Sequence, residues 1–216
     1  MIQLDPRTRI MAGCFSAVAG FVDVIGFLIT GGFFVSFMSG NSTRLGVGLE
    51  EGSRTAMVAG GLILTFVLGV IVGASVGRLA RAHKEPATLA LVTALLTLAL
   101  VLHWLGLGIL AAIPLALAMG AQNTVFAEDG EVRVGLTYMT GTLVKLGKRI
   151  AVALWGGERL GWVPYLLLWL GLLAGSVLGA AGFAQFGANA LIAPVLAMLA
   201  LTGVSAAGFK KRSDSV

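Results

Sequence analysis

The sequence predicts an all-α membrane protein with six transmembrane helices, arranged as two inverted three-helix repeats with re-entrant or broken segments. Three observations predict this fold: the apolar composition, the placement of the basic residues and a similarity between the two halves of the chain. Of the 216 residues, 57% are hydrophobic and only 12% are charged, against about 25% in a typical soluble domain. Such a chain could not cover an apolar core with polar surface, so we expect the lipid bilayer to surround it.

Six apolar runs approach the roughly 20 residues that a membrane-spanning helix needs. Two long linkers follow the first and the fourth run, and each contains an apolar piece that glycine interrupts. These pieces are too polar for ordinary lipid-facing spans, so we expect broken or re-entrant segments in residues 31–55 and 128–160. The predicted spans are residues 10–30, 56–77, 87–105, 107–127, 161–182 and 188–208.

Basic residues predict how the chain is oriented, because cytoplasmic loops of membrane proteins carry an excess of Lys and Arg. If the N-terminus is cytoplasmic, six spans leave only Arg44 and Arg54 outside, whereas the other basic residues all lie inside. One span more or fewer would destroy this asymmetry. We therefore predict a multi-pass protein with both termini in the cytoplasm. Nucleic-acid binding is excluded as an explanation of the net charge of +5, since the basic residues stand in short stretches between apolar runs.

The two halves of the chain, residues 1–106 and 107–216, resemble each other at an offset of about 100 residues. Each half contains three predicted spans, so the second copy would enter the membrane from the opposite side. This architecture recurs in secondary transporters, and it occurs in channels too, so the architecture alone does not fix the function. The matching positions are residues 20–23 with 120–123, residues 38–41 with 139–142, and Gly69, Gly73 and Gly77 with Gly171, Gly175 and Gly179.

Asp23 is the clearest candidate for a functional side chain. It lies inside the first predicted span, about 20 Å from its start, where a carboxylate costs at least about 2.5–3.5 kcal/mol. It should therefore face protein, water or a cation. One hypothesis makes Asp23 a ligand of the solute or a proton-coupling group, because ionisable residues inside membranes are usually functional. The alternative is a hydrogen bond that only holds neighbouring helices together.

Gln122 and Asn123 occupy the equivalent place in the fourth predicted span. Inversion would put them at a mirrored depth, so that they and Asp23 would flank the midplane of the membrane from opposite sides. Carboxamides both donate and accept hydrogen bonds, which suits a polar organic solute or an ion. The alternative role is a hydrogen bond between helices, worth about 0.6 kcal/mol.

The segments Ser39–Asn41 and Thr140–Thr142 combine hydroxyl groups with a flexible glycine, a composition typical of broken helices. Non-helical backbone at membrane depth is tolerated where it is buried in protein or lines a wet cavity. Helix ends there would present N–H groups to an anion. The alternative is a loop at headgroup level in which Asn41 or Thr142 caps a helix. The substrate-binding candidates are Asp23, Ser39, Asn41, Gln122, Asn123, Tyr138, Thr140 and Thr142.

The pattern of polar residues does not indicate an enzyme. His83 and His103 are far apart in the sequence and make no metal site with Cys14, and no glycine-rich phosphate loop is present. We therefore expect no cofactor, no metal and no catalytic residue. The glycines at every fourth position are interpreted as packing surfaces for close helix crossings, and a lipid-facing glycine ridge would make a homodimer plausible.

At these motifs the sequence resembles the YoaK-like family of multi-spanning bacterial membrane proteins, long labelled a domain of unknown function. The resemblance covers nearly the whole chain and depends on residues 20–23, 37–41, 118–123 and 137–142. The family usually has Thr where this chain has Ser39, which keeps the hydroxyl group. The resemblance implies a multi-spanning bacterial membrane protein, but it supplies no substrate. We expect the protein in the bacterial cytoplasmic (inner) membrane.

The polar residues and the repeat together predict a secondary transporter, or permease, for a small polar or anionic solute. In one version of this hypothesis Asp23 couples transport to protons. Two alternatives remain open at the level of sequence. The first is a passive channel of the same inverted-repeat architecture, and the second is a non-transporting scaffold or accessory protein in the membrane.

Overall fold

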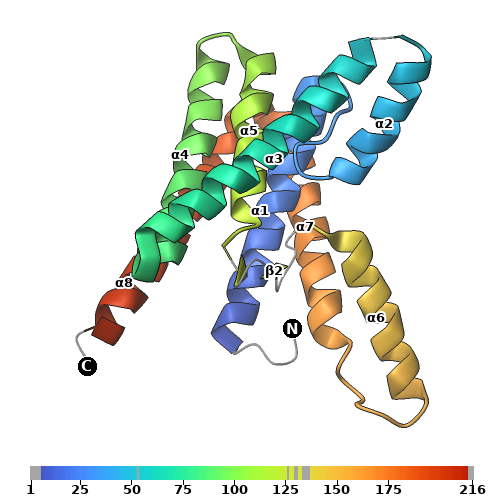
Figure 1. Cartoon of the computed structure of the whole chain (residues 1–216), viewed down its shortest axis with the longest axis vertical. Helices are drawn as coiled ribbons and strands as arrows, with labels where there is room; N and C mark the ends of the chain where they lie inside the picture. Colours follow the sequence, from blue (N-terminus) through green and yellow to red (C-terminus); the bar gives the residue numbers. More distant parts are fainter. Residues whose placement is uncertain (1–5, 53, 126, 129–130, 133–136, 214–216) are drawn as a thin grey trace.

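A computed structural model describes residues 6–52, 54–125, 127–128, 131–132 and 137–213, and these residues form a bundle of helices (Figure 1). Two two-residue strands, β1 (Ala127–Glu128) and β2 (Glu131–Val132), pair in antiparallel fashion. The α-helices are α1 (Pro6–Thr30), α2 (Met38–Glu50), α3 (Arg54–Ala80), α4 (Lys84–Trp104), α5 (Ala112–Gln122), α6 (Met139–Leu154), α7 (Val163–Phe186) and α8 (Ile192–Ser213).

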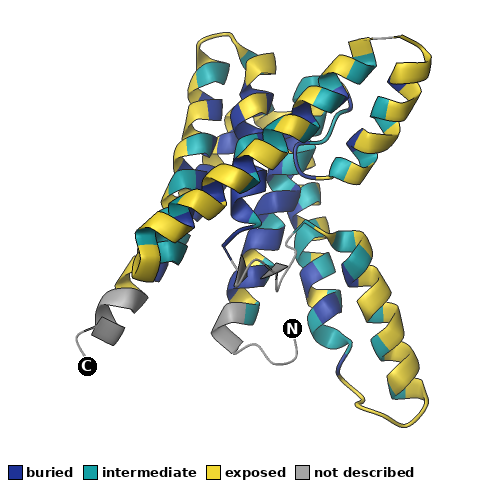
Figure 2. Cartoon of the chain, in the orientation of Figure 1, coloured by how far each residue is buried: buried dark blue, intermediate teal, exposed yellow. Residues whose placement is uncertain are grey.

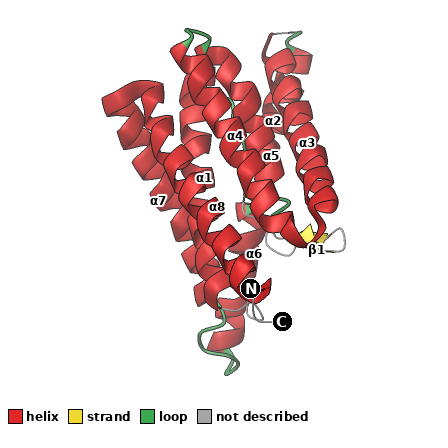
Figure 3. Ribbon diagram, turned by 90° about the vertical axis from the view of Figure 1, so that its left-hand side faces the viewer, coloured by secondary structure: helices red, strands yellow, loops and turns green. Residues whose placement is uncertain are grey.

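Three helical stretches are long and apolar enough to cross a membrane: Arg9–Thr30, Arg54–Trp104 and Val163–Ala207. Short 3-10 turns divide the second and third stretches, at Arg81–His83 and Gly187–Leu191. As a result α3 and α4 fold as separate helices, as do α7 and α8, and Figure 3 shows these helices running roughly along a common direction.

The fourth predicted span, residues 107–127, is wrong in its length. A 3-10 turn, Gly108–Ala111, leads into the 11-residue helix α5, which ends at Gln122, and β1 begins at Ala127. Hydrogen bonds at the helix end explain the early stop. The side-chain Nδ2 atom of Asn123 donates to the carbonyl of Met119, and the hydroxyl of Thr124 donates to the carbonyl of Ala121. Such side-chain hydrogen bonds compete with the backbone hydrogen bonds of a helix.

The predicted broken segments contain helices of their own. The helix α2 occupies most of residues 31–55 and α6 lies within residues 128–160, although residues 129–130 and 133–136 lie outside the described part of the chain. Figure 1 shows both helices on the same side of the molecule: α2 begins near the middle and runs upward, and α6 begins near the middle and runs downward. The non-helical backbone therefore precedes each of these helices.

The core is built from contacts between the two halves of the chain. The most extensive helix pairs are α1 with α7 and α3 with α5, and α4 also packs along α8. The side chains of Phe15, Val22, Leu96, Leu115 and Met119 are fully buried in one apolar cluster between these helices. Each long helix of one half is therefore covered by a helix of the other half.

Glycines permit the closest approach in both of these pairs. A Cβ atom on Gly175 would overlap the carbonyl oxygen of Ala17, and one on Gly179 would overlap the backbone of Phe21. In the other pair, a Cβ atom on Gly69 would overlap the carbonyl of Leu117, which the sequence alignment matches to Ala17. Small residues at such crossings let two backbones touch, so both pairs depend on glycine in the same way.

This geometry corrects the glycine alignment. A Cβ atom on Gly73 would meet the backbone of Ala121, which the alignment matches to Phe21, the residue that Gly179 contacts. By their contacts, Gly69 and Gly73 correspond to Gly175 and Gly179, one helical turn later than the alignment of the sequences placed them. In both pairs the contacts advance along both helices together, so each pair is parallel.

Many residues on the outer faces of the helices are exposed (Figure 2), and a large number of them are apolar. Val67, Leu68 and Ile71 on α3, and Val177 and Leu178 on α7, are each about half exposed or more. Soluble monomers rarely expose large continuous apolar surfaces. These faces have the composition expected of lipid-facing helices.

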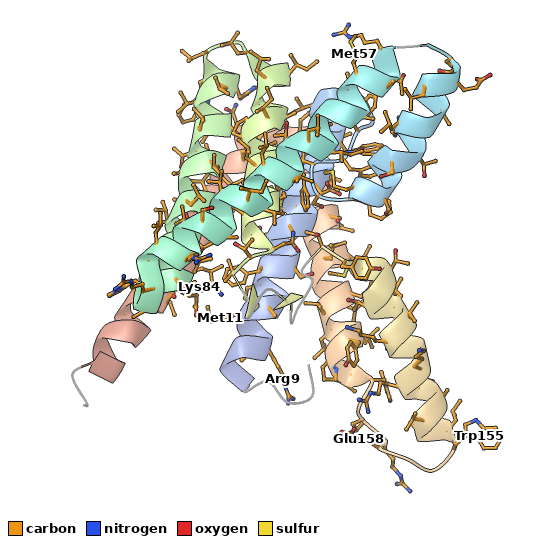
Figure 4. All side chains as sticks on the ribbon, in the orientation of Figure 1. Arg9, Met11, Met57, Lys84, Trp155 and Glu158 are labelled. Atoms are coloured by element: carbon orange, nitrogen blue, oxygen red, sulfur yellow. The ribbon has the colours of Figure 1, made fainter. Side chains whose placement is uncertain are left out.

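Charged residues near the helix ends lie mainly toward one end of the molecule. The start of α1 and the end of α8 lie at the same, lower end of the molecule in Figure 1. Figure 4 places Arg9, Lys84 and Glu158 toward that end and Met57 at the opposite end. The predicted cytoplasmic termini themselves, residues 1–5 and 214–216, lie outside the described residues.

Candidate functional site

Asp23 joins α1 to the non-helical segment that precedes α2. Its Oδ1 atom accepts hydrogen bonds from the backbone N–H groups of Val35, at 2.9 Å, and Ser36, at 2.7 Å. Phe37 is the N-cap residue of α2, and its side chain makes no capping hydrogen bond. Val35 and Ser36 both lie before the N-cap residue, so Asp23 holds the segment that leads into α2 and does not bind the N–H groups of its first turn, as a capping side chain would.

Two glycines determine the path of this segment. Gly31 and Gly32 have φ angles of +71° and +114°, which side chains with a Cβ atom rarely adopt. The chain therefore turns sharply at the end of α1, and the N–H group of Gly32 donates to the carbonyl of Phe27 at 2.8 Å. The turn brings Val35 and Ser36 back beside Asp23. We refer to residues 31–37 as the α1–α2 loop.

Asn41 holds the same loop from the opposite side. Its Oδ1 atom accepts from the N–H group of Phe34 at 3.0 Å, and its Nδ2 atom donates to the carbonyl of Phe34 at 2.7 Å. The side chain is fully buried. The alternative in which Asn41 caps a helix is wrong, because Asn41 stands in the first turn of α2, beyond the N-cap residue Phe37, and binds the loop.

The second half contains a comparable connection. Asn123 and Thr137 exchange hydrogen bonds, at 3.1 and 3.2 Å, between the end of α5 and the residues before α6. Thr137 stands two residues before Met139, the first residue of α6, just as Ser36 stands two residues before the start of α2. In each half, the aligned polar residue, Asp23 or Asn123, therefore binds the backbone or hydroxyl group that leads into a short helix.

Gln122 lies at another level of the molecule. Its side chain is fully buried, and its Nε2 atom donates to the carbonyl of Phe15 on α1 at 2.8 Å. Phe15 is eight residues before Asp23, which corresponds to about 12 Å along a helix. Among the described residues, the Oε1 atom of Gln122 is a buried polar atom without a hydrogen-bond partner.

The other candidates stand in the first turns of α2 and α6. The side chains of Ser39, Thr140 and Tyr138 are exposed, whereas that of Thr142 is buried and donates to the carbonyl of Tyr138. Within the described part of the chain, no hydrogen bond joins the group around Asp23 to Gln122 or Asn123. The structure thus brings together Asp23 and Asn41, and separately Asn123 and the start of α6.

Sequence reasoning missed the residues that complete these connections. Ser36 and Thr137 were not predicted as site residues, although the match of Met38 with Met139 already places them at equivalent positions. Sequence reasoning also gave no role to Arg44, whose guanidinium lies 5.1 Å from the ring centroid of Phe33 in the α1–α2 loop. The signal available for Arg44 was its position as one of two basic residues predicted outside.

A cavity of about 410 Å³ lies elsewhere, between the start of α1 and the start of α7. Its lining is mostly apolar and contains none of the predicted site residues. In the described residues there is also no cluster of three or more His, Cys, Asp or Glu side chains that could hold a metal ion. The residues that line the cavity are Arg9, Ile10, Gly13, Leu160, Val163, Pro164, Leu167 and Leu168.

Comparisons with known proteins agree with the apolar architecture. The family model described as "Protein of unknown function (DUF1275)" matches residues 11–204. The UPF0700 transmembrane protein RA0705 of Rhizobium meliloti (strain 1021) is 36% identical over 195 residues, which cover 90% of this chain and 84% of that protein. No solved structure matches. The resemblance drawn from the sequence motifs is confirmed, and the chain is a membrane protein.

Proposed function

This chain belongs to the DUF1275 family, and from its geometry we propose that it is a secondary transporter for a small polar or anionic solute. In this proposal six helical segments cross the bacterial inner membrane as two inverted three-helix repeats. The short α5 and the 3-10 turn before it form the fourth segment. Helices α2 and α6 enter the membrane from opposite faces without crossing it.

The observation that carries the proposal is that helices of one half pack against helices of the other half in two equivalent pairs. The parallel pair α1 and α7 and the parallel pair α3 and α5 use corresponding glycine contacts, and Figure 1 shows the two pairs running in opposite directions. Two equivalent units of opposite orientation can open a central site to either face in turn, and secondary transporters use this arrangement. A single-unit scaffold would not need such equivalence.

The non-helical segments before α2 and α6 support the same proposal. Irregular backbone at membrane depth persists where it is buried or lines an aqueous cavity. Here Asp23 and Asn41 hold one segment and Asn123 holds the other. We propose that these three residues position the segments. The solute would then contact the first turns of α2 and α6, where Ser39, Tyr138 and Thr140 are exposed.

The distribution of charge supports the proposed orientation. Nine of the 15 basic residues lie at the start of α1, at or beside the turn between α3 and α4, in the loop between α6 and α7 and at the end of α8. Figure 1 places these segments toward one end of the molecule. Under the positive-inside rule, that end is cytoplasmic.

Flux measurements in proteoliposomes test the proposed function. Purified protein would be reconstituted and challenged with concentration steps of acetate, phosphate, glycerol and urea, with and without an inward proton gradient. A transporter should move at least one of these solutes above the rate of empty liposomes, and a coupled transporter should move it uphill. A channel would give only downhill flux, and no flux for a wide solute panel would contradict the proposal.

Variants connect that flux to the site. Asp23→Asn should reduce transport, since it replaces the charged acceptor of the α1–α2 loop with a neutral amide. Asn189→Asp, at an exposed position of the 3-10 turn Gly187–Leu191, is the matched control, because the Oδ1 atom of Asn189 accepts from the indole N–H group of Trp104 and an aspartate would keep that acceptor. Equal transport by wild type and Asp23→Asn would show that Asp23 has no part in solute movement.

A further inference from the structure

Arg44 is a cation inside the proposed membrane domain to which the transport proposal assigns no role. It stands in the middle of α2, and its guanidinium lies over the ring of Phe33 in the α1–α2 loop, 5.1 Å from the ring centroid. We propose that Arg44 binds the anionic group of the solute, a carboxylate or a phosphate. This inference rests on the proposed transport function and narrows its substrate class to anions.

The direction in which Arg44 points is the first argument. Asn41 and Gly48 lie on the same face of α2, three residues before and four residues after it, and both are buried. This is the face that packs on the α1–α2 loop and on α3. A charged side chain on the inward face of a helix is costly in a membrane unless it meets a partner or water, and such residues commonly mark solute pathways.

The loop is shaped to receive the guanidinium. A Cβ atom on Gly32 would lie 3.2 Å from one terminal nitrogen of Arg44, and the φ angle of +114° also favours glycine at this position. Phe33 covers one face of the planar group. Gly32 and Phe33 thus fix the orientation of the guanidinium without using its hydrogen-bond donors.

Charge balance is the second argument. In the described part of the chain, no hydrogen bond or ion pair engages the guanidinium of Arg44, and the carboxylate of Asp23, which holds the same loop, accepts backbone N–H groups instead. The N–H groups along the edges of an arginine match two oxygens of a carboxylate or phosphate. With its face on Phe33 and its edge unpaired, Arg44 is arranged for such a two-point contact.

A purely structural role for Arg44 is the competing explanation. In that case the side chain would only pack on Phe33, and its reactivity would not depend on anions. Chemical modification of the wild-type protein separates the two without any risk of misfolding. Purified protein would be treated with phenylglyoxal, which reacts with arginine, in the presence of sodium phosphate, sodium acetate or neutral glycerol, and the modified residues would be identified by mass spectrometry.

The expected result is protection of Arg44 by phosphate or acetate, at least about tenfold relative to glycerol, as a two-point charge-assisted contact would give. Arg54, the other basic residue predicted outside, is exposed at the start of α3 and should react equally under all conditions. Equal reactivity of Arg44 with and without anions would overturn the inference. Equal protection of Arg54 would also overturn it, by showing a general effect of ionic strength.

Flux with matched variants completes the test. Arg44→Gln should abolish anion flux in proteoliposomes, Arg44→Lys should restore part of it, and Arg54→Gln should leave it unchanged. Thermal unfolding would establish that each variant is folded, and Phe33→Leu provides a second variant that keeps the charge but loses the ring. Glycerol flux without protection of Arg44 by anions would reject the role of Arg44 but not the transport function. Protection of Arg44 without flux of any solute would reject the transport function alone.

Discussion

The side chains of Asp23 and Asn123 perform related tasks with different chemistry. Asp23 only accepts hydrogen bonds, and its partners include the backbone N–H groups of Val35 and Ser36. Asn123 both accepts from Thr137 and donates to the carbonyl of Met119. The two residues are therefore not interchangeable, although they occupy aligned positions in the two halves.

This difference predicts the effect of Asn123→Asp. The new carboxylate would lose the donor that now reaches the carbonyl of Met119, and two oxygens would face each other there. We expect a destabilisation of about 1–3 kcal/mol, measured as a lower midpoint of thermal unfolding in detergent. Asn189→Asp, which retains its acceptor for Trp104, should change the midpoint little. Equal midpoints for both variants would argue against the described role of Asn123.

The sequence predicted that Asp23 and Asn41 need hydrogen-bond partners, but it did not predict which groups those partners are. Asp23 and Asn41 were singled out because polar side chains in apolar runs need a partner. Their partners are backbone groups of Phe34, Val35 and Ser36. The path of that backbone depends on two glycines with positive φ angles, and no pattern of side chains in the sequence specifies those angles.

At the scale of the elements, glycines determine how closely the long helices approach. A Cβ atom on Gly69 of α3 would overlap the backbone of Leu117 on α5, whereas a Cβ atom on Gly61, two turns earlier on the same helix, would have nothing within 4 Å. The two glycines thus share a helix and differ only in what they face. They provide a matched pair for measuring how much the close contact between α3 and α5 contributes to the free energy of unfolding.

Gly69→Ala should destabilise the protein by about 1–3 kcal/mol, because the added methyl group forces α3 away from α5. Gly61→Ala should be neutral or stabilising by up to about 1 kcal/mol, since alanine favours helix more than glycine does. Unfolding of both variants in the same detergent gives the comparison. A loss of stability at Gly61 equal to that at Gly69 would assign the effect to glycine content in general.

The positions of the long helices follow from hydropathy, because a run of about 20 apolar residues has few alternatives to a helix in lipid. The end of α5 does not follow from it. Val125 continues the apolar run, but the side chains of Asn123 and Thr124 bond to carbonyls of the last turn and end the helix earlier. The α2 and α6 helices were likewise read as interruptions, because their first turns are rich in hydroxyl groups and glycine.

At the scale of the whole molecule, the proposed topology puts the loop between α2 and α3 and the loop between α6 and α7 on opposite sides of the membrane. Figure 1 shows them at opposite ends of the bundle. Glu51 and Glu158 are exposed residues of these two loops. Replacing Cys14 with serine removes the single cysteine of the chain and allows each loop to be labelled separately.

In a Cys14→Ser background, Glu51→Cys should react with a membrane-impermeant maleimide applied to spheroplasts, because its loop is predicted outside. Glu158→Cys should react only after the membrane is permeabilised. Its weak surface ion pair with Arg149, at 3.6 Å, contributes little to stability. Labelling of both positions from the same side would contradict the orientation and the number of crossings proposed here.

The pairing of α1 with α7 and of α3 with α5 has a consequence for any shorter version of this protein. Residues 1–106 alone would leave the backbone-contact glycines of α3 facing lipid, since the helix that covers them comes from residues 107–216. Under the proposed inverted topology, a half-length chain could cover them only with a second molecule inserted in the opposite orientation. If the proposed topology holds, such a half-length chain would have to insert in both directions, which requires too little charge bias to favour one of them.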